Sequence, residues 1–246
     1  YYTYDNYGNR IRSSGQTQTF NEGNVIFAYN WKRGSCLASI KDGAGISVAD
    51  YTYDRNGVRD KKVVKKGSSI VTTKYYYDGN KIIGEDRSNG IKLRYFYDAE
   101  GVCGFSYYDG MTWEKFTYVK DIMGSIIMIK NEEGTAIAKY NYNVFGAASV
   151  QKVTPEDLLI NPHLMSLLDR YTYERARGYE LEIGNVNPFR WKGHYYDDDC
   201  VYHSSQSGYY YIDGRYYDPN EGIYIDAEPV ENMFGNAETV FGLDRH

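Results

Sequence analysis

The chain has 246 residues and a net charge of −5, and it contains 29 Tyr and 25 Gly. So many aromatic residues argue against a disordered chain, and tyrosine and glycine are both poor helix formers, which argues against an all-helical protein. No stretch is basic enough for a nucleic-acid site, and no apolar stretch of about 18 residues could cross a membrane. We therefore expect a β-rich protein with no nucleic-acid partner and no membrane span in this sequence.

The first 150 residues repeat a unit of the form Tyr-x-Tyr-Asp-x-x-Gly. Its Asp or Asn stands at positions 5, 30, 54, 78, 98, 121 and 143, which are 20 to 25 residues apart. Two tyrosines at i and i+2 point to the same face of a strand, and Asp-x-x-Gly favours a turn. Clear copies are Tyr51, Tyr53, Asp54, Gly57 and Tyr95, Tyr97, Asp98, Gly101. The pattern predicts stacked antiparallel β-hairpins over 1–150, with the tyrosine pairs packed against neighbouring repeats.

Residues 151–186 interrupt the repeat. Thr154 is a good helix N-cap and Pro155 suits the first helical position. Leucines at 164, 167 and 168 then lie on one helical face. We expect a short helical insert, with helix mainly within 154–171, that packs on the sheet.

Residues 187–246 carry a denser motif. It runs from Asn187 to Asp197 and again from Gly208 to Gly222. Its core-motif positions are Asn187, Pro188, Phe189, Arg190, Gly193, Tyr195, Tyr196, Asp197, Arg215, Tyr216, Tyr217, Asp218 and Pro219. The repeat resembles the tyrosine–aspartate repeat of Rhs proteins, and 187–226 is similar to the Rhs repeat-associated core segment. That family includes bacterial polymorphic toxins, the C components of insecticidal toxin complexes, wall-associated proteins and, more distantly, teneurins. The chain departs from the family pattern by extra residues at Cys200–Gln206 and by the length of the insert before Asn187.

The resemblance implies a mainly β fold in which stacked hairpins form a spiral sheet, as part of a hollow Rhs shell. It also implies that the shell encloses or presents a C-terminal toxin or effector domain of the same polypeptide, with an immunity protein as a further partner. The parent protein would be secreted or at the cell surface. The sequence begins without Met and has no apolar leader, so we expect a piece of a longer protein whose signal lies elsewhere.

Some Rhs proteins cut themselves after the core segment with an aspartyl-protease-like arrangement, and Arg215, Asp226 and Glu228 are the matching candidates. Glu228 stands where Asp is usual, and no Asp-Pro-x-Gly cut motif is present. An arginine beside carboxylates keeps them charged, whereas an acid catalyst needs a raised pKa. We therefore expect no catalysis, and instead an ion pair in which Arg215 pins the final hairpin.

Metal chemistry is not indicated. Cys36, Cys103 and Cys200 are odd in number and widely spaced, which fits neither a disulfide framework nor a zinc site. The four histidines share no metal-ligand spacing. The charged runs Lys61–Lys66 and Asp197–Asp199 are interpreted as solvated, although the acidic run could bind calcium. No metal and no cofactor is expected.

Three functions remain open. The leading hypothesis is a structural shell segment. The first alternative is a cell-surface adhesin or carbohydrate-binding module, in which exposed aromatic rings hold surface glycans. The second is part of a self-cleaving protease.

Overall fold

The computed structural model describes residues 2–14, 25–153, 179–198 and 208–227. In this part of the chain, fourteen strands form one sheet in which each strand pairs antiparallel with the next along the sequence. Four further strands form a second, smaller antiparallel sheet. The predicted fold class, stacked antiparallel hairpins with little helix, is therefore confirmed.

We call the large sheet the outer sheet. Its strands are β1 (Tyr2–Tyr4), β2 (Arg10–Ser14), β3 (Val25–Lys32), β4 (Cys36–Asp42), β5 (Ser47–Tyr53), β6 (Arg59–Lys66), β7 (Ser69–Asp78), β8 (Lys81–Arg87), β9 (Lys92–Asp98), β10 (Gly101–Tyr108), β11 (Trp113–Lys120), β12 (Ile126–Lys130), β13 (Ala136–Tyr142) and β14 (Ala148–Lys152).

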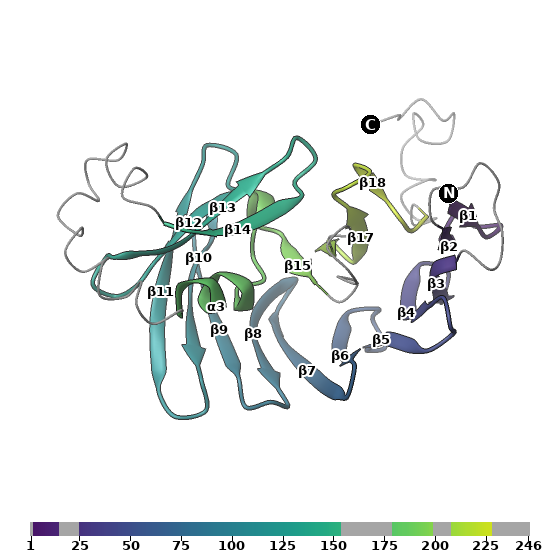
Figure 1. Cartoon of the computed structure of the whole chain (residues 1–246), viewed down its shortest axis with the longest axis horizontal. Helices are drawn as coiled ribbons and strands as arrows, with labels where there is room; N and C mark the ends of the chain where they lie inside the picture. Colours follow the sequence, from purple (N-terminus) through teal and green to yellow (C-terminus); the bar gives the residue numbers. More distant parts are fainter. Residues whose placement is uncertain (1, 15–24, 154–178, 199–207, 228–246) are drawn as a thin grey trace.

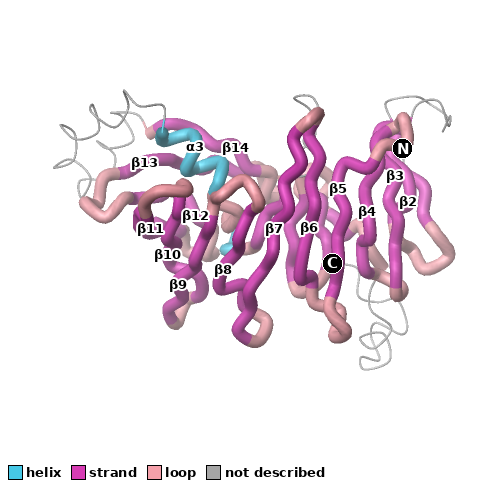
Figure 2. The backbone as a smooth tube through the Cα atoms, turned by 90° about the horizontal axis from the view of Figure 1, so that it is seen from below, coloured by secondary structure: helices cyan, strands magenta, loops and turns pink. Residues whose placement is uncertain are grey.

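Residues 187–198 and 208–227 are called the inner segment. Its elements are the 3₁₀ turn η3 (Trp191–Gly193) and the strands β15 (Tyr195–Asp197), β16 (Tyr209–Ile212), β17 (Arg215–Asp218) and β18 (Ile223–Tyr224). Figure 1 shows the outer sheet curving as an open arc, with the small sheet and helix α3 (Tyr179–Val186) inside the curve. Figure 2 shows the outer strands side by side in chain order. The side chains inside the curve therefore decide how the two sheets are held together.

Each Asp-x-x-Gly forms the turn that the sequence predicts. Asp54 Oδ1 accepts hydrogen bonds from the backbone N–H of Asn56 at 2.8 Å and of Val58 at 2.9 Å. Gly57 has a φ of +82°, a conformation that glycine adopts without strain, and its N–H donates to the Asp54 carbonyl. The same pattern recurs at Asp5, Asp42, Asp121 and Asn143. The turns are thus fixed by local chemistry.

At five turns of the outer sheet a β-bulge follows, and an aromatic side chain of the next repeat hydrogen-bonds to the backbone there. Between β5 and β6, Tyr53 pairs with Arg59 but Thr52 pairs with Lys61, so Asp60 is the extra residue. The carbonyl just before it, of Arg59, accepts a hydrogen bond from the Tyr77 hydroxyl at 2.7 Å. Equivalent bonds run from Trp31 to Arg10, Tyr53 to Leu37, Tyr97 to Ile82 and Tyr142 to Ile126. A buried carbonyl needs a hydrogen-bond partner, and the second aromatic residue of the motif supplies the donor.

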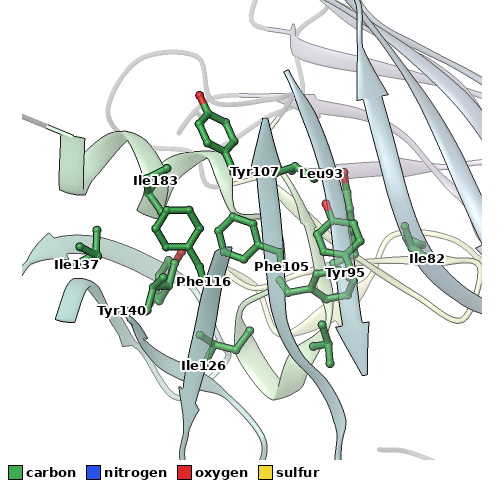
Figure 3. Close-up of a cluster of buried hydrophobic side chains, with 14 of the residues drawn as sticks. Ile82, Leu93, Tyr95, Phe105, Tyr107, Phe116, Ile126, Ile137, Tyr140 and Ile183 are labelled. Carbon is green, nitrogen blue, oxygen red and sulfur yellow. The ribbon is translucent and has the colours of Figure 1, made fainter. Parts of the chain in front are cut away.

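The first tyrosine of each pair supplies the apolar core. Tyr51 and Tyr95 are buried and share a face with the partly buried Tyr53 and Tyr97, as predicted. Figure 3 shows one of the two large clusters, in which the rings of Phe105 and Phe116 stack with centroids 5.1 Å apart; its labelled members include Ile82, Leu93, Tyr107, Ile126, Ile137, Tyr140 and Ile183.

Helix α3 lies within the expected helical insert 151–186, but after the range 154–171 in which most of the helix was expected. It packs on β13 and β14, where Ile183 is fully buried and a Cβ at Gly184 would lie 2.5 Å from Val150 Cγ1. The helix expected at 154–171 lies outside the described residues, and β14 extends to Lys152, inside the expected insert 151–186. Gly184, Asn185 and β-branched residues weaken the helical signal of α3, so packing decides its structure. Neither α3 nor the 3₁₀ turn among the described residues is long and apolar enough to cross a membrane.

We expect Tyr97→Phe to lower the free energy of unfolding by about 1 kcal/mol, because the ring stays packed while the bond to the Ile82 carbonyl is lost. The control is Tyr76→Phe, since Tyr76 lies on the opposite face and donates to the partly exposed Asp86. It should change stability by less than about 0.5 kcal/mol. Urea unfolding of both variants measures the difference, and equal losses would contradict the role of the bulge bond.

Candidate functional site at the contact between the two sheets

Asn187, the first residue of the predicted motif, is a fully buried hydrogen-bonding centre. Its Nδ2 donates to the Tyr140 hydroxyl at 3.0 Å and to the Phe189 carbonyl at 2.7 Å. Its Oδ1 accepts a hydrogen bond from the Tyr118 hydroxyl at 2.6 Å. Tyr118 occupies the position whose aromatic side chain donates to a bulge carbonyl in other repeats. In this repeat its hydroxyl donates to Asn187 instead.

The residues that follow Asn187 lie against the inner face of the outer sheet. The Phe189 ring meets Tyr95 and Tyr195 edge-on, at centroid distances of 4.7 and 5.6 Å. The backbone N–H of Ile126 donates to the Arg190 carbonyl, which joins β12 to this segment. Trp191 packs on Gly146, where a Cβ would lie 2.4 Å from the indole ring. Glycine in that turn therefore allows the indole to approach the backbone.

Asp197 forms the most buried charged contact between the two sheets. Its carboxylate is paired with the Arg59 guanidinium and, at 2.7 Å, with Lys62 Nζ. Burial acts to raise the pKa of Asp197, but the charges of Arg59 and Lys62 outweigh it and lower that pKa. The Arg59 guanidinium also lies over the rings of Tyr75 and Tyr211, at 4.7 and 4.3 Å from their centroids.

Two further buried carboxylates are also paired with arginines. Arg10 Nη1 pairs with Asp218 Oδ2 at 2.8 Å, with both groups buried. In the middle of the sheet, Glu85 is fully buried, is paired with Arg87 and accepts a hydrogen bond from the Tyr195 hydroxyl. Both aspartates of the core motif, Asp197 and Asp218, thus bind arginines of the outer sheet.

These contacts correct one interpretation of the sequence. Asp197 and Lys62 were expected in solvated charged runs, but both are buried and paired with each other. The sequence analysis also did not single out Arg10 and Arg59. A signal was present, since each stands two residues after a turn glycine, Gly8 or Gly57, at an inward-facing repeat position.

The remaining motif residues complete the small sheet. Tyr196 and Tyr210 are buried with ring centroids 5.0 Å apart. The Tyr216 hydroxyl lies 3.1 Å from that of Tyr53, and the Tyr217 hydroxyl donates to the Phe145 carbonyl. Pro188 and Pro219 are buried, and Gly193 has a φ of +71°. The motif is therefore explained by packing and hydrogen bonding between the sheets.

The self-cleavage candidates are only partly described. Arg215 Nε lies 3.6 Å from Asp226 Oδ2, and Arg215 Nη2 donates to the Asp226 carbonyl at 3.1 Å. Asp226 Oδ1 accepts a hydrogen bond from the Tyr216 N–H, which ties the last strands together. Glu228 and the extra residues Cys200–Gln206 lie outside the described residues. The expected ion pair of Arg215 is thus present with Asp226.

The described residues bring together no three side chains of His, Cys, Asp or Glu that could hold a metal ion. Burial lowers the pKa of His194, whose ring lies 6.3 Å from that of Trp191. The contact between the sheets consists of buried charge pairs and aromatic contacts.

No family model matches the chain. In sequence it is similar to proteins named tRNA nuclease WapA, from Bacillus subtilis strain 168, and tRNA(Glu)-specific nuclease WapA, from Bacillus subtilis subsp. natto. The identity is 27% over 239 residues in both cases. The match covers 96% of this chain but 8% of each relative, so the chain corresponds to a small part of those proteins.

In structure the chain is similar to the crystal structures of TcdB2-TccC3-Cdc42 and of TcdB2-TccC3 without the hypervariable C-terminal region. The TM-score is 0.56 and the identity 16%, with 93% of this chain and 12% of the solved chain covered. At this identity the likeness shows the fold. The shared fold agrees with the Rhs-like β-shell of stacked antiparallel hairpins that the repeat motif implied.

We expect Asp197→Asn to lower the free energy of unfolding by about 3 kcal/mol at pH 7, because Arg59 is left buried without its carboxylate. The folded pKa of Asp197 is lowered, so its stabilisation is present above the unfolded pKa of about 4 and is lost as the pH falls further. The variant should therefore lose less stability than the wild type between pH 7 and pH 3.

Asp98→Asn is the matched control, because Asp98 is a half-exposed turn residue and asparagine keeps its bond to Glu100 N–H. Urea titrations at both pH values measure the effect. Equal stability of the Asp197 variant and the wild type at pH 7 would show that the pair does not hold the sheets together.

Proposed function

We propose that this chain is a closing segment of an Rhs-type shell, in a larger protein that encloses or presents a C-terminal toxin or effector domain. The observation that carries the proposal is the inner segment, which fills the inside of the curved sheet. It is held there by the buried pairs Arg10–Asp218 and Arg59–Asp197. A segment fixed in this way is suited to cap the end of a hollow shell rather than to leave its interior open. The parent protein would act outside its own cell or at the cell surface, with an immunity protein as a partner.

The outer face of the sheet favours this role over a carbohydrate-binding module. It carries aromatic rings, but a cation lies over each of three of them. Lys92 lies 5.5 Å from the Tyr108 ring, Arg94 5.8 Å from that of Trp113 and Lys115 5.2 Å from that of Phe96. A sugar would need those ring faces for stacking, and the cations already occupy them.

The proposal is tested on the parent polypeptide. Electron microscopy should show a hollow β-shell with this segment at one end, and the domain that follows it should resist protease. Asp197→Asn should make that domain sensitive to protease, because the closing segment loses its charge pair. Lys65→Gln is the control, since Lys65 forms a half-exposed pair with Asp50. An open sheet without an interior, or equal protection in all three proteins, would contradict the closing role.

We also propose that this segment is not catalytic. Arg215 and Asp226 act as a structural ion pair, because Asp226 also accepts a hydrogen bond from the Tyr216 N–H and its carbonyl accepts one from Arg215. Incubation of the purified chain between pH 4 and pH 8 should leave its mass unchanged in mass spectrometry. A discrete cleavage that disappears in Arg215→Ala would instead establish self-cleavage.

A further inference from the structure

Arg190 differs from the other buried arginines. Arg10, Arg59 and Arg190 are all at least nine-tenths buried, and the first two are paired with Asp218 and Asp197. Within the described residues Arg190 has no carboxylate partner. Its Nε has no hydrogen-bond partner, as is also true of Arg10 and Arg59, and its Nη2 makes one long contact of 3.5 Å with the Asn185 carbonyl. A buried cation is costly unless it is paired and hydrogen-bonded.

The surroundings compensate this charge only in part. The guanidinium lies over the ring of Tyr196 at 4.3 Å and faces that of Tyr140 at 5.6 Å. A ring face attracts the positive charge, but these contacts leave the Nε–H without an acceptor. An anion would satisfy both the charge and the unused donor.

Arg190 lines a cavity of about 190 Å³ between β6, β7 and the start of the inner segment. Lys62, Lys66 and Arg87 line it too, and Asp198 is the acidic side chain among its lining residues. Lys62 pairs with Asp197, and Arg87 pairs with Glu85, both outside the lining. Much of the remaining wall is apolar, formed by Val64, Val71, Val186 and Pro188.

Asp198 shows how these cations act together. Its side chain is half exposed and lies 3.2 Å from Lys66 Nζ. Desolvation acts to raise the pKa of Asp198, but the charges of Lys66, Lys62, Arg190 and Arg87 outweigh it and lower that pKa. Asp197 and Glu85 neutralise Lys62 and Arg87 from outside the lining, so the remaining charge comes from Arg190 and Lys66 against the one carboxylate of Asp198. This excess of one positive charge favours an anion in the cavity.

We infer that this cavity binds a small anion, a carboxylate or phosphate group carried on a partly apolar molecule. The guanidinium of Arg190 supplies planar donors that match either group, and Lys66 adds a mobile charge at the rim. The valines and Pro188 contact the apolar part of the ligand. Binding there bridges β6 and β7 of the outer sheet to the inner segment.

Isothermal titration of the whole chain with benzoate tests the site, with benzamide as the neutral ligand of the same shape. Benzoate should bind saturably, inorganic phosphate should compete with it at constant ionic strength, and benzamide should not bind. Saturable binding of benzamide, or no saturable binding of benzoate and phosphate at millimolar concentrations, would overturn the inference.

Variants identify the residues. Arg190→Gln should weaken benzoate binding by about tenfold or more, and Lys66→Gln should weaken it several-fold. The matched control is Lys65→Gln, because Lys65 is the neighbour of Lys66 on the other face of β6 and does not line the cavity. It should bind benzoate as the wild type does. If Arg190→Gln does not fold, the comparison of Lys66→Gln with Lys65→Gln decides, and equal affinities in those two variants would exclude the cavity.

Discussion

The backbone carbonyls at the β-bulges have to be hydrogen-bonded, and this requirement shapes the whole outer sheet. Each bulge interrupts the ladder between two strands, and at five of the bulges an aromatic side chain from the next repeat donates to the carbonyl beside it, as Tyr77 does to Arg59. The bond crosses from one hairpin to the next, so the repeats that share it depend on each other. At these bulges a single hairpin does not satisfy its own carbonyl, so neighbouring repeats stabilise one another in the array.

The bulges also place side chains on the inner face of the outer sheet, where they contact the inner segment. The residue whose carbonyl is bound at the bulge points its side chain inward, and at two repeats this residue is an arginine, Arg10 or Arg59. These cations meet Asp218 and Asp197 of the inner segment. At Tyr118 the hydroxyl bonds Asn187 instead of a bulge carbonyl. Sheet formation and attachment of the inner segment therefore use the same repeat positions.

Buried charge pairs make this contact specific. A carboxylate in the inner segment is tolerated inside the protein only where a cation of the outer sheet lies opposite, so a shift in register would leave both groups unpaired. Arg190 departs from this pattern, because it faces a cavity rather than an acid. The contact between the sheets thus contains both a structural set of ion pairs and a site with unused binding capacity.

The sequence by itself determined the features that depend on neighbouring residues. The Asp-x-x-Gly turns, the strand alternation and the shared face of Tyr95 and Tyr97 follow from local backbone chemistry within a few positions. The tertiary structure alone decided which charges meet. Arg59 and Asp197 are 138 residues apart in the chain and Arg10 and Asp218 are 208 apart, so no local pattern connects them. It also decided that Lys62 is buried and that α3 is helical, because burial and packing against distant strands outweigh local composition.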